Sequence, residues 1–140
     1  MDAKEFLAKQ LDTTGYQLQA VFAGFPDGKW DERTCNEAMS AKETAEHLAE
    51  CYVAFLDHCE GREHEWGSFK PASSDPEKIV AEMFELRAKA IATFMARNGD
   101  DVLGWASDYI VLHDPYHVGQ MCSLRLELGE FSPYSIYKMD

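Results

Sequence analysis

The stretch from Tyr109 to Leu128, YIVLHDPYHVGQMCSLRLEL, places two histidines four residues apart, at His113 and His117. Four residues of an α-helix complete one turn plus about 40°, so both imidazoles reach from one face toward the same point. Two interpretations fit this pair: two buried imidazoles satisfied by their neighbours, or two ligands of one metal ion. A third ligand elsewhere in the chain would decide between them.

The apolar residues of the same stretch recur at helical spacing and define a face that packs inward. This stripe consists of Tyr109, Leu112, Tyr116, Gln120/Met121, Leu124 and Leu128. The two histidines lie on or beside the stripe. We therefore expect them on the core side of the helix, with Tyr109 and Tyr116 as core aromatics.

Pro115 stands between the two histidines and removes a helical hydrogen bond to Val111. Two outcomes are open. The helix either continues with a kink or begins anew, with Asp114 as its cap and Pro115 as its first residue. The inward stripe continues through this region, which favours the kink and keeps the two imidazoles convergent.

Composition indicates one globular, cytoplasmic domain. The 140 residues are 46% hydrophobic and 27% charged. No apolar run is long enough to span a membrane, and we expect no secretory signal. The net charge of −12 disfavours binding to nucleic acids and to anionic membranes. The four cysteines show no CxxC pair, so we expect free thiols.

Three further helices are expected before the histidine stretch, and no segment alternates as strands do. The first covers residues 3 to about 23, with Gly15 at its centre. Ser40 and Glu43 form a capping box for the second, which ends at Gly61, and Asp75 caps the third with Pro76 at its first position. The fold class is all-α, a four-helix bundle spanning residues 1–140.

The second helix carries a further histidine in its second turn, His47 in SAKETAEHLAE. Together with HDPYHVGQM and RLELGEFSPYSIY in the last part of the chain, this set resembles the DinB-like superfamily (DinB/YfiT type) of small four-helix bundles. The resemblance covers nearly the whole chain. It implies a three-histidine metal site formed by His47, His113 and His117, and commonly a homodimer.

The resemblance also implies a metal-dependent hydrolase or a thiol-dependent S-transferase acting on a small molecule, with a low-molecular-weight thiol as a further cofactor in the second case. The alternative function is a metal-binding or stress-associated homodimeric bundle without catalysis. Three imidazoles suit a divalent transition metal such as zinc, nickel, iron or cobalt and leave it an open position.

Other polar residues have two interpretations each. Glu50 is the candidate proton acceptor and Gln120 a candidate partner of a ligand imidazole, but solvated helix surface and an ordinary interhelical hydrogen bond also fit. Cys51, four residues after His47, is either a further ligand or, as we expect, a small buried thiol. His58 and His64 are expected at the surface, away from His47.

Overall fold

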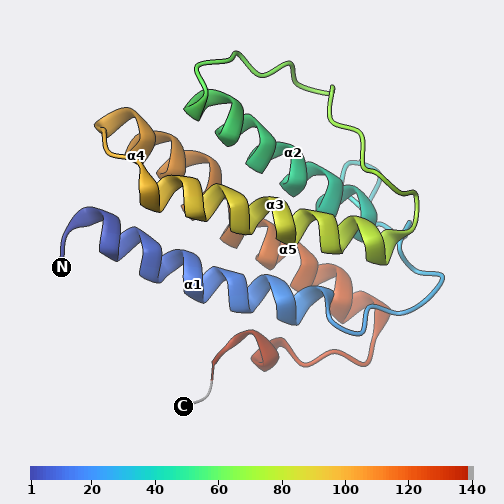
Figure 1. Ribbon diagram of the computed structural model, residues 1–140. Helices are drawn as coiled ribbons and strands as arrows, with labels where there is room; N and C mark the ends of the chain where they lie inside the picture. The colour runs from blue at the N-terminus through green and yellow to red at the C-terminus, as the bar shows by residue number, and fades with distance from the viewer. Residues whose placement is uncertain (139–140) are drawn as a thin grey trace.

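The computed structural model describes residues 1–138 and contains only helices and loops within them. Four long rods run alongside one another (Figure 1). They comprise α1 (Ala3–Phe22), α2 (Ala41–Cys59), α3 (Pro76–Ala96) and a fourth rod made of α4 (Asp100–Ala106), the π-helix η1 (Ser107–Val111) and α5 (His113–Leu128). A short 3-10 helix, η2 (Pro133–Ile136), follows. The predicted all-α four-helix bundle is confirmed.

The helices begin where their capping residues stand. The Ser40 hydroxyl accepts a hydrogen bond from the Glu43 backbone N–H at 3.2 Å, and the Glu43 carboxylate accepts from the Ser40 N–H at 3.1 Å. Asp75 accepts from the Glu77 N–H at 3.1 Å, with Pro76 at the first helical position. These bonds satisfy N–H groups that have no partner inside the helix, which confirms both predicted starts.

The core fills the space between the four rods. Pairs of rods pack closely, α2 against α3 and α1 against α5. The largest fully buried side chains are Tyr52, Phe55, Phe94, Leu11, Leu18, Leu48, Ile79, Met83, Ile110 and Met121. The two helices that carry the three histidines, α2 and α5, also contact each other and contribute to the same hydrophobic core.

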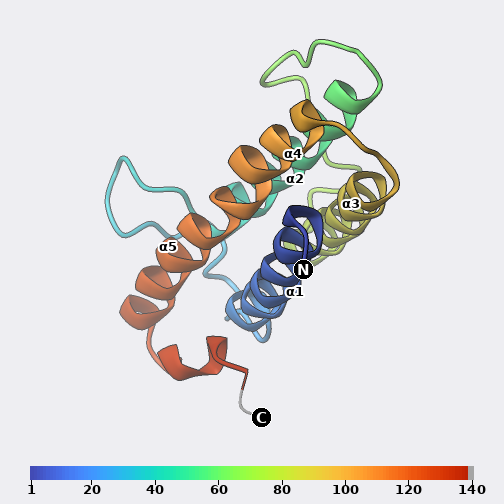
Figure 2. The same cartoon turned by 90° about the vertical axis from the view of Figure 1, so that its left-hand side faces the viewer.

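The fourth rod differs from the prediction in its inward face. Its path is continuous (Figure 2), but Leu112 donates its N–H to the Ser107 carbonyl, five residues back, at 2.9 Å. This wide π turn carries an extra residue and shifts the inward face, so the predicted stripe is wrong at two positions. Leu112 is 66% exposed and Tyr116 61% exposed, whereas Ile110 and Asp114 are buried.

The π turn also resolves the question posed by Pro115. Leu112 keeps right-handed helical angles, and α5 starts at His113, so the chain does not restart with Asp114 as a capping residue. The Asp114 side chain instead points into the core. The chain thus follows the predicted continuous path, with a π turn just before α5, whose third residue is Pro115.

The four cysteines, Cys35, Cys51, Cys59 and Cys122, are free thiols, as predicted. Within residues 1–138, no helix combines the length and the apolar character needed to cross a membrane.

Candidate metal centre

The structure brings His47, His113 and His117 together between α2 and α5. The Nε2 atom of His113 lies 3.1 Å from His47 Nε2 and 3.0 Å from His117 Nε2. The potential ligand nitrogens of the three rings all lie within 4.8 Å of one another. The second turn of α2 supplies one ring and the first two turns of α5 supply the others, so the helix pairing creates the cluster.

The short distances between these nitrogens fit a shared cation. Each neutral imidazole nitrogen offers either one N–H or one in-plane lone pair, so His113 Nε2 cannot form a good hydrogen bond to both neighbours at once. A central ion would use all three lone pairs. Metal–nitrogen bonds of about 2.0–2.1 Å place neighbouring ligand nitrogens about 2.9–3.4 Å apart at octahedral or tetrahedral angles.

The protonation states also suit metal binding. Burial lowers the pKa of His117 to about 3, with smaller contributions from His113 and His47. Burial, assisted by His47, lowers the pKa of His113 to about 4. The pKa of His47 is lowered by burial as well, against an opposing effect of Glu50. All three rings are therefore neutral at pH 7, the form in which histidine binds a metal.

The Nδ1 atoms of two of the rings lack the hydrogen-bond acceptor that metal-bound histidines usually have. Metal-bound histidines normally donate their second N–H to an acceptor, but the buried Nδ1 atoms of His113 and His117 have no hydrogen-bond partner among residues 1–138. Gln120 lies beside His117 and opposes the lowering of its pKa. Its amide nitrogen donates to the Tyr116 hydroxyl at 3.0 Å, while its buried Oε1 has no partner in the described chain.

Glu50 connects the second loop, residues 60–75, to the neighbourhood of the centre. Its two carboxylate oxygens accept from the Gly67 backbone N–H at 2.6 and 3.2 Å. The nearer oxygen lies 3.8 Å from His64 Nε2. Glu50 thus helps to hold this loop on α2, and its role as proton acceptor stays a prediction.

The prediction of a surface position is wrong for His64. Its side chain is only 4% exposed, and its Nδ1 lies 2.9 Å from Asp57 Oδ2. The loop folds back over α2 because Asp57 and Glu50 offer acceptors two turns apart on the same helix, and His64 fits between them. His58 stacks on Trp105 with a centroid distance of 4.0 Å. Neither residue belongs to the three-histidine cluster.

A buried polar network adjoins the centre, and the sequence analysis missed it. The fully buried Asp114 accepts from the Tyr52 hydroxyl at 2.8 Å and from Arg87 Nε at 2.9 Å. Arg87 Nη2 donates to the Leu11 carbonyl at 2.6 Å and to Thr14 Oγ1 at 3.0 Å. The available signal was Arg87 itself, an arginine within the apolar stripe of α3.

Cys51 is the nearest thiol to the centre, with its Sγ 3.9 Å from His47 Nε2. It is buried, and burial raises its pKa to about 12, with smaller contributions from Asp114 and Glu50. At neutral pH it is a protonated thiol, which agrees with the expected small buried side chain.

Comparison with known proteins gives the family. A model of the DinB superfamily matches residues 10–122, a range that includes all three histidines. Neither the curated proteins nor the solved structures gave a significant match. The family match covers most of the chain and agrees with the helical bundle and with the motifs that suggested the resemblance. The chain belongs to the DinB superfamily.

Proposed function

We propose that the protein is a metal-dependent enzyme that acts on a small molecule, with a divalent transition metal held by His47, His113 and His117. The observation that carries this proposal is the crowding of three neutral, half-buried or buried imidazoles at Nε2 distances of 3.0 and 3.1 Å. These nitrogens cannot all satisfy one another, whereas one cation would satisfy all three.

The ligand set favours catalysis over a closed structural site. Three neutral ligands do not complete the coordination of a divalent ion and leave a position for water or substrate. When bound, such an ion supplies Lewis acidity and lowers the pKa of a bound water or thiol. The chain's contribution is to keep the rings neutral by burial and to fix the first turn of α5 through Asp114.

Within this class we propose hydrolysis or transfer of a group to a low-molecular-weight thiol, as the family resemblance implies. Both reactions use a small nucleophile that must lose a proton, and Glu50 is the proposed acceptor of that proton. A carboxylate has about four acceptor positions, so Glu50 retains capacity while it binds the Gly67 N–H.

Metal analysis of protein purified without a histidine tag tests the first part. We expect about one equivalent of a transition metal per chain after growth with metal supplementation. His47→Ala and His117→Ala should each lose the metal, while the matched control His58→Ala keeps it. Full metal content in either ligand variant would contradict the assignment.

A screen of metal-loaded protein tests the second part, with small esters and amides for hydrolysis and small thiols with electrophilic acceptors for transfer. Turnover should depend on the metal and fall in Glu50→Gln with the metal content unchanged. Turnover that persists in metal-free protein would contradict the mechanism. A metal-loaded protein that turns over no compound of either class would contradict the enzymatic proposal and leave metal binding in place.

A further inference from the structure

Arg87 has hydrogen-bonding capacity that the fold does not use. A guanidinium carries five N–H donors. Nε donates to the Asp114 carboxylate, and Nη2 donates to the Leu11 carbonyl and to Thr14 Oγ1. Both donors of Nη1 remain, and no acceptor within residues 1–138 takes them, although the residue is only 6% exposed. The remaining donors are available to a ligand wherever the side chain borders open space.

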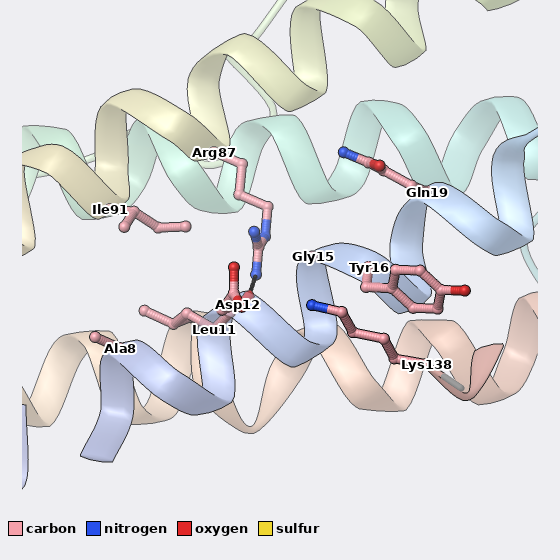
Figure 3. Close-up of a pocket in the computed structure, with 9 residues that line it drawn as sticks. All are labelled: Ala8, Leu11, Asp12, Gly15, Tyr16, Gln19, Arg87, Ile91 and Lys138. Carbon is pink, nitrogen blue, oxygen red and sulfur yellow. Dashed lines mark hydrogen bonds between the residues drawn. The ribbon is translucent and has the colours of Figure 1, made fainter. Parts of the chain in front are cut away.

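Arg87 lines a pocket between α1 and α3 with a volume of about 390 Å³ (Figure 3). Arg87 extends from α3 toward Gly15 on α1, and a side-chain carbon at residue 15 would lie 2.7 Å from Nη1. The glycine that weakens α1 as a helix thus makes room for the guanidinium. The pocket volume falls in the range of small-molecule sites, about 300–1,000 Å³.

A second hollow of about 410 Å³ adjoins the first, and the two share Gln19, Arg87 and Ile91 in their walls. Its remaining lining consists of the apolar side chains of Phe84, Ala88 and Ala92. The groove formed by the two hollows therefore has hydrogen-bond donors where the hollows meet and an apolar wall in the second hollow. A ligand that fits both parts has a polar head and an apolar body.

Two charged side chains at the first pocket narrow the choice of head group. Lys138 reaches the pocket from the segment after η2 and adds a positive charge, whereas Asp12 on α1 adds a negative one (Figure 3). A guanidinium N–H beside a lysine suits a carboxylate, whose oxygens accept charge-assisted hydrogen bonds. Asp12 disfavours a doubly charged group such as phosphate, because like charges repel at short range.

We propose that the groove between α1 and α3 binds a small monocarboxylate with an apolar body, whose carboxylate accepts hydrogen bonds from Arg87 Nη1. The apolar body lies against Ile91 and Phe84, and Lys138 contributes charge at the rim. This site is separate from the three histidines, none of which lines either hollow. The proposal therefore stands whether or not the metal-dependent activity is found.

Titration of the wild-type protein with octanoate, followed by two-dimensional NMR, tests the proposal. We expect saturable shifts of the amide signals of Gly15, Gln19 and Ile91. 1-Octanol and octylammonium share the apolar body of octanoate but lack the carboxylate. Their affinity should be at least about tenfold lower, because hydrogen bonds between charged groups are the strongest contacts that the proposed site offers. The proposal is overturned if the three compounds bind with equal affinity. It is also overturned if the saturable shifts occur at other residues or if no signal shifts saturably.

Three variants sharpen the test without altering the Arg87–Asp114 pair. Lys138→Gln should weaken octanoate binding about threefold, and Asp12→Asn should strengthen it by a similar factor, as expected for partly solvated charges. Lys78→Gln, on α3 but outside this groove, should change nothing. If Lys138→Gln and Asp12→Asn both leave the affinity unchanged, the head group does not bind beside Arg87 and the proposal fails.

Discussion

Two polar clusters meet at the first turn of α5, and they differ in how well their atoms are satisfied. His113 faces His47 and His117, while the next residue, Asp114, faces Arg87 and Tyr52. Each Asp114 oxygen receives a hydrogen bond at 2.8 or 2.9 Å. In the histidine cluster three nitrogens crowd together, and the Nδ1 atoms of His113 and His117 have no partner in the described chain.

This difference in hydrogen bonding indicates that one cluster stabilises the fold and the other binds a ligand. A buried carboxylate whose two oxygens both accept hydrogen bonds favours one conformation, whereas buried polar atoms without partners cost free energy. Proteins keep such costly groups mainly at functional sites. The Asp114 network thus supports the bundle, and the histidine cluster marks the place where a ligand is needed.

Removing Asp114 should have the largest effect on stability. Asp114→Ala leaves the Arg87 guanidinium buried without its carboxylate, so we expect a loss of about 3–5 kcal/mol in the free energy of unfolding. Urea denaturation measures it. Asp108→Ala, at an exposed aspartate of η1, is the matched control and should leave stability nearly unchanged. A loss below about 1 kcal/mol in Asp114→Ala would remove the distinction between the two clusters.

Metal addition should raise stability through the histidine cluster alone. A free metal concentration of about 100 times the Kd stabilises the folded state by about 2.7 kcal/mol. The measurement is the urea midpoint of metal-free protein with and without added zinc or nickel. The increase should disappear in His47→Ala and persist in His58→Ala. An equal increase in both variants would place the metal elsewhere.

Removing a metal ligand should cost far less stability than removing Asp114. In metal-free protein, His113→Ala should change the free energy of unfolding by about 1 kcal/mol or less, because no satisfied hydrogen-bond network is lost. The same variant should lose its metal. Urea denaturation and metal analysis on one preparation give both results. A loss as large as that of Asp114→Ala would show that the histidines are structural.

The pH dependence of metal-free protein should be the smallest of these effects. The folded-state pKa values of His113 and His117 lie below the ordinary value of 6.5, at about 4 and about 3. Between pH 6.5 and 4 the unfolded chain therefore binds more protons, so stability falls as the pH falls. Because the rings are partly screened by solvent, we expect a modest slope. His113→Gln should flatten it, and an unchanged slope would mean that this ring does not contribute.

The structure confirms much of what local sequence patterns predicted, and it brings the three histidines together as the family resemblance implied. The capping residues and the apolar periods located the helices, since these signals act within one or two turns. The prediction of which residues of the last rod face inward was wrong at Leu112 and Tyr116, which are exposed. One extra residue in the π turn shifts the helical repeat of the residues around it. His64 was misplaced because its acceptors belong to α2 rather than to its own loop.

The sequence alone determined the helical class, the starts of α2 and α3 and the free state of the thiols, because each follows from hydrogen bonds, periodicity or composition read over short distances. Tertiary structure decided which side chains meet. His47 and His113 are 66 positions apart, Arg87 and Asp114 are 27 apart, and Arg87 reaches the Leu11 carbonyl across 76. Such contacts depend on how whole helices pack, so only the assembled bundle shows that one arginine joins a buried carboxylate to an open groove.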